Sequence, residues 1–594
     1  MNRRSFLQVS STALLAGSVP GRLFAAALPG TPDFSTRAFE YSGMGLWQWK
    51  SIDRALAMME ELGFNTLILH QSDLPDYLVR PRSCFSDDFM AARNPTRWAV
   101  THTGRNYIRE VVRRAARAKL RVFLSSNEIG FADGLVELHP ELLEEGSVVC
   151  PTHPFWWEFE RAKFAEVISE IPGLGGFVVS PASRDGKLSF AVRNCDCARC
   201  RSYDPAAWYA NLVRSIHEPV AAAGQTLVVR DYAYTREEQN HVVYACSRVS
   251  PDIVVSMKNT PHDYYPAFPD NPRIGDAGGQ PQWVEFDAMG KFAGSGVFPC
   301  SLVEDMRRRL GHARRNGVTG VSFRADIETV TDSSVFNSPN ILNLFAGGLL
   351  SRSASADLGG IYSAWFAYGL SDPLKTDSEQ PGTAPVGPGD AGRIREFMQS
   401  SRAVLEKTLY VRGLVIADGT GQFPDSVDRA FDNMLVLHQR EDWEPGASRR
   451  VEPTEENLRL VAAEKEQAER EAARLPVLLD LGKSRLPGEL RASLETMLDL
   501  YQGYVRGFRR CTLACFTTRR AMVTRAPEDV AAARSAAGLL ADYRTEMEGR
   551  LSKGFLPHYV HRILDLGCIE RLMGDVQSKL ASISAGGGPG GDTA

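Results

Sequence analysis

Short apolar segments alternate with amphipathic helical segments between about residues 39 and 370. The apolar segments are rich in Val, Phe, Leu and Ile without strict alternation, as expected of strands covered on both faces. Several of the helical segments end at a glycine, as at Gly63. The predicted strands are Tyr41–Trp49, Asn65–His70, Arg121–Ser126, Gly176–Ser180, Thr226–Asp231, Ile253–Lys258, Gln282–Met289 and Thr319–Arg324. The predicted helices between them include Ile52–Leu62, Asn106–Ala118, Phe155–Ile168, Trp208–Ala223 and Glu304–Asn316.

Eight strand–helix units in some 330 residues favour a (β/α)8 TIM barrel, an α/β fold, over an open doubly wound sheet. No Gly-x-Gly-x-x-Gly turn follows the first predicted strand, which argues against a dinucleotide-binding sheet. We therefore expect a catalytic barrel over residues 31–370.

The alternation of predicted strands and helices stops at residue 371. Residues 371–392 are rich in Pro, Gly, Ser and Asp, which is typical of a linker or an exposed loop. Residues 393–582 are helical almost throughout and predict an all-α C-terminal domain packed on the barrel, through which a homodimer could form. The glycine-rich residues 583–594 predict a disordered tail. The predicted helices are Arg393–Tyr410, Glu455–Leu475, Pro487–Arg509, Pro527–Lys553 and Tyr559–Ser582.

Residues 1–30 predict a Tat signal peptide. Arg3 and Arg4 precede an apolar stretch from Thr12 to Val19, and Ala25-Ala26-Ala27 offers a cleavage site. The alternative is a chance arginine pair ahead of a short amphipathic helix. No later apolar run reaches the roughly 20 residues of a membrane span. We therefore expect a mature protein without a membrane span, periplasmic or secreted, which folds before export.

Composition and charge narrow the function classes further. The 594 residues include 68 Lys+Arg and 72 Asp+Glu, for a formal charge of −4. A nucleic-acid partner usually requires a basic surplus, so none is expected. The mean hydropathy of −0.22 argues against a polytopic membrane protein. A soluble enzyme or a large binding protein remains.

Three cysteines lie within six residues, at Cys195, Cys197 and Cys200. Such a trio could hold a structural zinc ion with a fourth ligand from elsewhere. In an oxidising compartment the alternative is a local disulfide with one thiol left over. We expect a structural role in either case and no cofactor for catalysis. Cys511 and Cys515, four apart in a helical pattern, are predicted to be small buried hydrophobic residues.

Polar residues follow many of the predicted strands, and TIM barrels place their chemistry at the C-terminal ends of the strands. Acids and bases from several strands can flank a sugar, as glycoside hydrolysis requires, and aromatic rings can stack on sugar faces. For any single carboxylate, an ion pair or a helix cap is the alternative role. The candidates are Glu128, Asp185, Arg230, Lys258, Asn259, Asp263, Lys291 and Arg324, with the aromatic residues Trp47, Trp49, Tyr232 and Tyr264.

The segment Lys258-Asn259-Thr260-Pro261-His262-Asp263-Tyr264 resembles the Lys-Asn-Gly-Pro-x-Asp-Phe segment of family 67 glycoside hydrolases, the α-glucuronidases of xylan degradation. Residues 175–179 and 183–186 resemble that family's fourth-strand segment, which carries its general acid. Residues 229–234 resemble its fifth-strand segment, and residues 339–366 its Asn-containing helix and Trp near the close of the barrel. The resemblance covers roughly residues 40–580. It implies a glycoside hydrolase acting on uronic-acid-containing or other anionic oligosaccharides.

The resemblance also implies roles for individual residues. Family 67 enzymes invert the anomeric centre, and the matching segments place Asp185 at the acid position and Asp263 in the base pair. Arg230 and Lys258 match residues that bind the carboxylate of the uronic acid, a role suited to permanent cations. The alternative for both cations is a structural ion pair with Asp231 or Asp263.

The sequence departs from family 67 at one expected carboxylate. The second basic carboxylate of the family aligns with Lys291. A cation there would lower the pKa of a nearby Asp263 or hold an anionic group of the substrate. The lysine at this position suggests two alternative functions. The protein could be a non-catalytic carbohydrate-binding barrel, or a uronate lyase in which Lys291 is the base.

Two further features separate the chain from the family. The family's N-terminal β-domain has no counterpart before the barrel. The Cys-x-Cys-x-x-Cys segment instead resembles hexosaminidase-like barrels that carry such a segment after their fourth strand. We therefore expect a divergent relative of family 67.

Overall fold

The structure, a computed structural model, describes residues 32–72, 74–132, 134–144, 148–325, 335–375, 383–417, 421–437, 439–554 and 556–585. The predicted signal peptide at residues 1–30 lies outside these ranges. So do residues 586–594 of the predicted tail.

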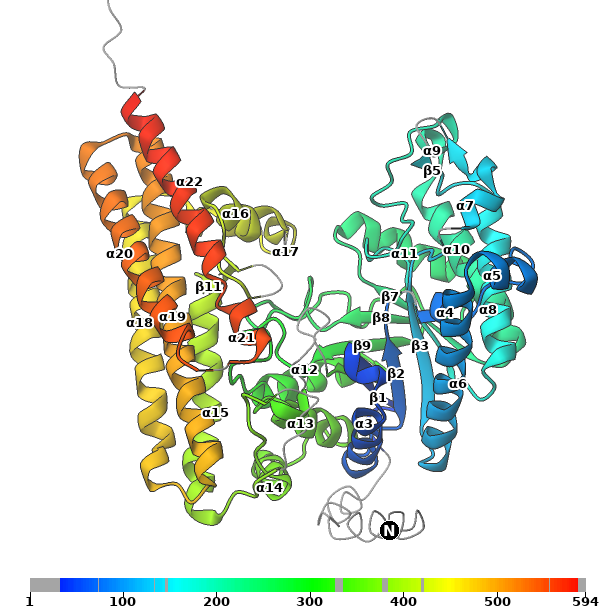
Figure 1. Cartoon of the computed structure of the whole chain (residues 1–594), viewed down its shortest axis with the longest axis horizontal. Coiled ribbons are helices and arrows are strands. Elements are labelled where there is room, and N and C mark those ends of the chain that lie inside the picture. Colours follow the sequence, from blue (N-terminus) through cyan, green and yellow to red (C-terminus); the bar gives the residue numbers. More distant parts are fainter. Residues whose placement is uncertain are drawn as a thin grey trace, which may run out of the picture.

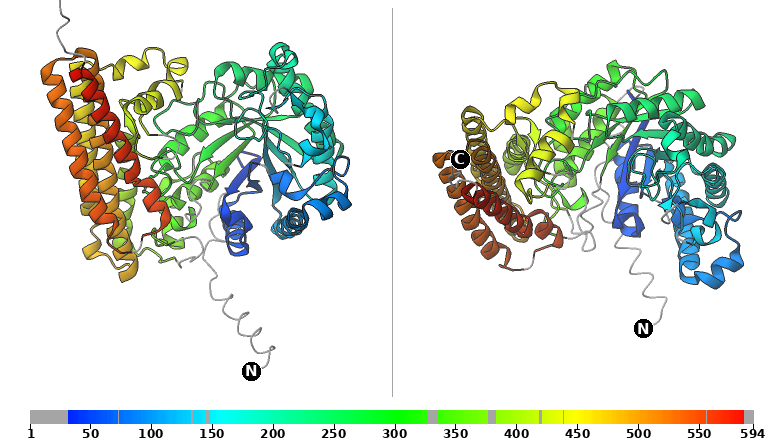
Figure 2. Two further views of the ribbon diagram at one scale, coloured as in Figure 1. Left: turned by 45° about the horizontal axis from the view of Figure 1, so that its top comes forward. Right: turned by 90° about the horizontal axis from the view of Figure 1, so that it is seen from above.

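Eight parallel strands close into a barrel, which confirms the predicted (β/α)8 fold (Figures 1 and 2). Their order around the barrel is β1-β10-β9-β8-β7-β6-β3-β2, so neighbours in space are also neighbours in the chain. Each strand is short and almost fully buried, which agrees with its apolar composition. The strands are β1 (Thr36–Ser42), β2 (Thr66–His70), β3 (Arg121–Asn127), β6 (Gly176–Ser180), β7 (Thr226–Asp231), β8 (Val254–Lys258), β9 (Gln282–Asp287) and β10 (Gly320–Arg324).

The first strand lies earlier in the chain than predicted. The prediction was Tyr41–Trp49, but Trp47 belongs to a short 3-10 helix and Trp49 begins helix α3 (Trp49–Leu62). The true strand contains Arg37 and Glu40. These charged residues lower the hydropathy of the segment, so the apolar pattern does not identify it as a strand. Both are buried and paired; Arg37, for example, donates from Nε to the carbonyl of Gly63 at 2.8 Å. Tertiary contacts therefore make this polar segment compatible with a barrel strand.

Helices cover the outside of the barrel except between β8 and β9. There the chain from residue 259 to 281 forms a helix-free loop. The buried guanidinium of Arg309 organises this loop by donating to the carbonyls of Asn259, Pro266, Phe268 and Pro269. The covering helices are α3, α6 (Pro95–Arg117), α8 (Phe155–Glu170), α10 (Pro205–Ala222), α11 (Arg236–Val249), α12 (Val303–Arg315) and α13 (Ile341–Arg352).

The barrel interior is layered, because every second residue of a strand points inward. One layer is apolar and consists of Ala38, Ile68, Phe123, Val178, Val228, Val254 and Trp283. The residues two positions further along the same strands form a polar layer, in which every member is buried: Glu40, His70, Ser125, Ser180, Arg230, Ser256 and Glu285. The interior therefore changes from hydrocarbon to charge toward the C-terminal ends of the strands, where barrel enzymes place their active sites.

The C-terminal helices form a bundle at one side of the barrel (Figure 1). The first helix begins at Pro388, so the last residues of the predicted linker are helical. Helix α22 likewise continues to Ala585, into the predicted tail. The bundle consists of α15 (Pro388–Leu409), α18 (Glu455–Leu479), α19 (Gly488–Thr524), α20 (Pro527–Leu551) and α22 (Leu566–Ala585). Cys511 and Cys515 are fully buried on α19, as predicted.

Direct contacts join the bundle to the barrel. Phe298, in the loop after β9, stacks on Tyr501 of α19 with ring centroids 4.9 Å apart. The amide of Ser301 donates to Ser401 Oγ of α15 at 3.2 Å. Among the described residues, no helix is both long and apolar enough to cross a bilayer.

Candidate active site at the mouth of the barrel

Arg230 on β7 occupies the centre of the polar layer. Its Nε donates to Glu285 Oε1 at 2.7 Å, its Nη2 donates to Glu40 Oε2, and its Nη1 lies 3.0 Å from His70 Nδ1. The guanidinium is completely buried between these groups. Its planar fork suits the bridging of two carboxylates. Arg230 therefore forms a structural ion pair, the alternative to substrate binding, although with different partners from those predicted.

Glu285 on β9 accepts four hydrogen bonds. Its Oε1 receives Arg230 Nε and, at 2.5 Å, Ser256 Oγ, while its Oε2 receives the hydroxyls of Tyr232 and Tyr264, both at 2.8 Å. Burial opposes ionisation, but the charge of Arg230 and these hydrogen bonds keep the pKa of Glu285 below its usual value. Glu285 is therefore a buried anion that orients the two tyrosines. Tyr264 is buried and Tyr232 is half-buried, so of these two rings only that of Tyr232 is partly accessible to a ligand.

Asp263 lies on the loop after β8 and is held by two basic side chains. Lys258 Nζ lies 2.7 Å from its Oδ1, and His262 Nδ1 lies 3.3 Å from its Oδ2. Burial alone would raise the pKa of Asp263, but the nearby Lys258 and His262 hold it well below its usual range. The residue has a φ of 52°, in the left-handed region, and its side chain is 25% exposed. Asp263 is thus an ionised carboxylate that solvent can reach, and Lys258 forms the ion pair given above as the alternative to substrate binding.

Asp185 lies in the loop after β6, and Glu128 anchors this loop. Glu128 is fully buried at the end of β3 and accepts from Ser183 Oγ and from the backbone amides of Arg184 and Gly186. Burial raises the pKa of Glu128, against the effect of these hydrogen bonds. Asp185, between the two anchored amides, is exposed. Glu128 therefore positions the Asp185 loop and does not itself face solvent.

Tyr234 connects the Asp185 loop to the Asp263 loop. Burial raises the pKa of Tyr234 to about 12, and the charges of Asp263 and Asp185 both contribute. Its ring lies 5.5 Å from that of His262, and the guanidinium of Arg184 lies 4.7 Å above it. Arg184 precedes Asp185 and His262 precedes Asp263, so these two ring contacts bring the loops after β6 and β8 together at Tyr234.

Asp287 is the last residue of β9, and the turn that follows it contains Lys291. Asp287 accepts from the amides of Gly290 and Phe292 at 2.9 and 3.2 Å, which closes this turn. Burial raises the pKa of Asp287, while these amides, Arg324 and Lys291 lower it. Lys291 is half-buried, with Nζ 5.4 Å from the Phe292 ring. Lys291 and Arg324 are therefore cations close enough to Asp287 to act on its charge.

Three predicted substrate contacts lie away from the polar layer. Trp47 and Trp49 pack on Tyr107 of α6, with ring centroids 5.4 and 4.1 Å apart, and Arg114 covers Trp49 at 4.1 Å. They join the first loop of the barrel to α6. Asn259 is buried, and its backbone links β8 to β9. These residues support the barrel mouth in this structure.

One solved structure shares the whole architecture. It is a GH138 enzyme targeting pectin rhamnogalacturonan II, with a TM-score of 0.61 at 12% identity, covering 94% of this chain and 84% of that chain. A Thermobaculum terrenum O-GlcNAc hydrolase mutant has a TM-score of 0.43 at 11% identity, covering 93% of this chain and 96% of that one. A Flavobacterium johnsoniae chitobiase has a TM-score of 0.39 at 12% identity, covering 85% and 75%.

These structural neighbours are glycoside hydrolases, and at such low identity the likeness to the GH138 enzyme establishes a shared fold. No protein-family profile and no curated protein sequence matches the chain. The resemblance to family 67 therefore has no support from a sequence profile.

Sequence reasoning missed Glu40 and His70. Glu40 Oε1 lies 2.8 Å from His70 Nδ1, and both side chains are buried beside Arg230. Burial would raise the pKa of Glu40, but Arg230 and His70 hold it well below its usual range. A signal was present: Glu40 and His70 each stand two positions after an inward apolar residue, Ala38 or Ile68. Extending that alternation along each strand would have placed them in the same interior layer.

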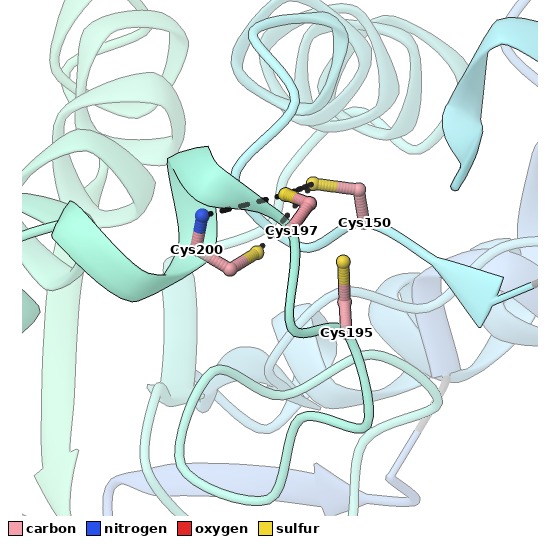
Figure 3. Close-up of side chains that lie close together, drawn as sticks. All are labelled: Cys150, Cys195, Cys197 and Cys200. Atoms are coloured by element: carbon pink, nitrogen blue, oxygen red, sulfur yellow. Dashed lines mark hydrogen bonds between the residues drawn. The ribbon is translucent and has the colours of Figure 1, made fainter. Parts of the chain in front are cut away.

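A separate group of side chains could hold a metal ion. Cys150 joins the predicted ligands Cys195, Cys197 and Cys200, and the four sulfur atoms lie within 4.8 Å of one another (Figure 3). Sequence spacing could not reveal Cys150, which is 45 residues before Cys195. The group lies in loops beyond the barrel mouth and apart from the carboxylates described above.

Proposed function

We propose that the protein is a glycoside hydrolase of uronic-acid-containing or other anionic oligosaccharides, with Asp185 as general acid and Asp263 as general base. The observation that carries the proposal is that Tyr234 contacts the neighbours of both aspartates, Arg184 at 4.7 Å and His262 at 5.5 Å, while Asp263 is ionised and partly exposed. A carboxylate pair flanking the scissile bond is the common requirement of glycoside hydrolysis. The fold shared with a GH138 enzyme supports the same class of reaction.

The cations of the mouth support an anionic substrate. Lys258 pairs with Asp263, Arg184 with Glu238 at 2.7 Å and Arg324 with Glu40 at 3.5 Å, while Lys291 acts on the charge of Asp287. Four positive side chains thus come from the loops or strand ends of β6, β8, β9 and β10. A carboxylated sugar that shares these cations with their present partners would gain charge-assisted hydrogen bonds that a neutral sugar cannot make. This arrangement supports an α-glucuronidase-like specificity.

The chemistry then divides between the two loops. Asp263 accepts a proton from the water that attacks the anomeric carbon, and Asp185 donates a proton to the departing glycosidic oxygen. When the sugar binds over Asp185, it excludes water from the carboxyl group, and this favours the neutral, proton-carrying form of Asp185. Lys258 keeps Asp263 ionised between turnovers. We take the outcome to be inversion, as in family 67.

Substrates with different leaving groups test the roles of Asp185 and Asp263 separately. On aldouronic oligosaccharides, Asp185→Asn and Asp263→Asn should each lower kcat/KM by at least about 100-fold, the lower end of acid–base contributions. On an activated dinitrophenyl uronide, which needs no protonation, Asp185→Asn should retain most activity, whereas Asp263→Asn should not. Asp252→Asn is the matched control, because Asp252 precedes β8 at the opposite end of the barrel and is exposed.

Other outcomes identify other functions. Undiminished turnover in both variants would remove the two aspartates from the mechanism. Binding of acidic sugars without turnover would indicate a carbohydrate-binding barrel. A product with new ultraviolet absorbance that disappears in Lys291→Gln would indicate a uronate lyase with Lys291 as base. The anomer first formed, followed by proton NMR, distinguishes inversion from retention.

The twin-arginine segment places this activity outside the cytoplasm in our proposal. A reporter fused to residues 1–30 should be exported through the Tat system and should stay inside when Arg3 and Arg4 are replaced by lysine. Export of the double-lysine variant would contradict a Tat signal.

A further inference from the structure

Four cysteines from two loops converge beyond the barrel mouth (Figure 3). Cys150 directly follows β5 (Val148–Val149), in the crossover between β3 and α8. Cys195, Cys197 and Cys200 belong to the crossover between β6 and α10, where Cys197 caps the short helix α9 (Ala198–Ser202). The ligand set therefore closes only when the two crossovers come together.

The spacing of the sulfur atoms suits a single metal ion. Cys150 Sγ lies 3.8 Å from Cys197 Sγ and 3.6 Å from Cys200 Sγ. A disulfide requires about 2.05 Å between sulfurs. Four thiolates at about 2.3 Å from a tetrahedral zinc ion stand about 3.8 Å apart. These two separations match the edges of such a tetrahedron, and all four sulfur atoms lie within 4.8 Å of one another.

The surroundings form a built site. Cys150, Cys195 and Cys200 are buried and Cys197 is half-buried. Thr152 Oγ1 lies 3.2 Å from Cys200 Sγ, and the amide of Cys200 donates to Cys197 Sγ at 3.4 Å. Such hydrogen bonds to the ligand atoms orient metal-binding thiolates. Four sulfur ligands with no oxygen or imidazole favour zinc or iron over magnesium and calcium.

We propose that Cys150, Cys195, Cys197 and Cys200 bind one structural zinc ion that ties the β3–α8 crossover to the β6–α10 crossover. All four coordination positions are filled by protein, which is the pattern of a structural site and leaves no position for substrate. The assignment does not depend on the proposed glycosidase activity. A chain that folds in the cytoplasm before export, as the twin-arginine segment predicts, would meet zinc while its thiols are still reduced.

The same two crossovers carry the Asp185 loop and its anchor. Glu128 begins one crossover and contacts Ser183, Arg184 and Gly186 in the other. Trp208 Nε1 at the start of α10 donates to the carbonyl of Pro151 at 2.8 Å, next to Cys150. The zinc site is therefore a further tie between the crossovers, in addition to the backbone bridge between Ile129 and Leu188, and its loss should loosen the loop that presents Asp185.

Metal analysis of the full-length protein, purified without added zinc or chelator, tests the proposal. We expect elemental mass spectrometry to find about one zinc ion per chain in the wild-type protein. It should find less than a tenth of that amount in Cys150→Ser and in Cys197→Ser. Cys246→Ser and Cys84→Ser are the matched controls, because these cysteines lie outside the cluster, one buried and one half-buried. Both controls should keep full zinc occupancy.

Two further measurements keep the test decisive if the cluster variants fail to fold. Cobalt exchanged into the wild-type protein should give the visible absorption of tetrahedral thiolate coordination. Titration of the denatured, unreduced chain should find all ten cysteines as free thiols. Iron in place of zinc, a thiol count lower by two or more, or ten thiols without bound metal would each overturn the proposal.

Discussion

Lys258 and Asp263 form an ion pair, with 2.7 Å between Nζ and Oδ1, at the point where β8 leaves the barrel. The pair joins the last residue of a strand to a residue with a left-handed backbone in the following helix-free loop. The lysine also lies 4.2 Å above the ring of Tyr232, whose hydroxyl is held by Glu285. One cation thus connects the buried ion pairs of the barrel to the half-buried carboxylate of the proposed site.

Replacing Lys258 by methionine should change the pH dependence of the reaction. The pKa of Asp263 is held low first by Lys258 and then by His262, against burial, so removing the lysine raises it. A base has to be ionised, so the acidic limb of kcat/KM against pH should move to higher pH. Lys553→Met, at an exposed position, should leave the profile unchanged. An unshifted acidic limb in Lys258→Met would separate Asp263 from the base.

Arg230→Met should strongly destabilise the barrel. It leaves Glu40 and Glu285 as buried carboxylates without their shared cation, which costs about 3–5 kcal/mol for comparable pairs. Removing the exposed Arg314 partner of Asp33 should cost less than about 1 kcal/mol. Urea unfolding followed by circular dichroism measures both.

A companion variant separates the charge effect from lost packing. Combining Arg230→Met with Glu40→Gln and Glu285→Gln should recover much of the stability, because the two buried carboxylates that lost their shared cation are then replaced by neutral amides. Failure of this triple variant to recover would assign the loss to packing around the guanidinium.

Asp231→Asn should stabilise the protein at neutral and alkaline pH. Burial raises the pKa of Asp231 from 3.8 to about 6, although Arg273 and Lys258 oppose the shift. The folded state then binds this proton more tightly than the unfolded state, so its contribution is fully present below about pH 4 and is lost as the pH rises through 6. Two pKa units correspond to about 3 kcal/mol at most. Melting temperatures of both proteins from pH 4 to 8 should diverge as the pH rises; parallel curves would contradict the raised pKa.

Gly186→Ala should disturb the Asp185 loop without unfolding the protein. A Cβ at Gly186 would lie 2.6 Å from Glu128 Oε2 and 2.8 Å from Glu128 Cβ, so the loop has to move. Misplacing a catalytic group by about 1 Å can cost about 100-fold in rate. Gly538→Ala on α20 is the control, because no atom lies within 4 Å of its added Cβ. We expect kcat/KM on the uronide to fall in the first variant and the melting temperature to rise slightly in the second.

Local pattern was enough to predict the barrel but not every element of it. Seven of the eight strands carry enough Val, Ile, Leu and Phe to be placed to within a few residues. β1 was misplaced because Glu40 is compatible with a barrel interior only beside Arg230, which is 190 positions away. The loop after β8 lacks a helix because Arg309, from α12, supplies the partners of its carbonyls.

For the candidate site too, the sequence predicted part of the arrangement and the tertiary structure supplied the rest. Strand-end reasoning selected Asp185, Asp263 and Lys258, and the loops after β6 and β8 that carry them do approach one another at Tyr234. It also selected Arg230 as a substrate ligand, but a guanidinium between two buried carboxylates is already neutralised. The role of a charged residue depends on which opposite charges surround it, and those charges come from other strands.

By itself, the sequence determined the alternation of strands and helices, the change to a helical domain and the close spacing of three cysteines, which fits either a metal site or a local disulfide. These features follow from short-range periodicity and spacing, which act within a few turns of chain. The tertiary structure decided that Glu40, Arg230 and Glu285 form one buried network, that the loops of Asp185 and Asp263 meet at Tyr234, and that Cys150 joins the cysteine group. Closure of the barrel brings these residues together, because parallel strands place distant segments of the chain side by side at one edge.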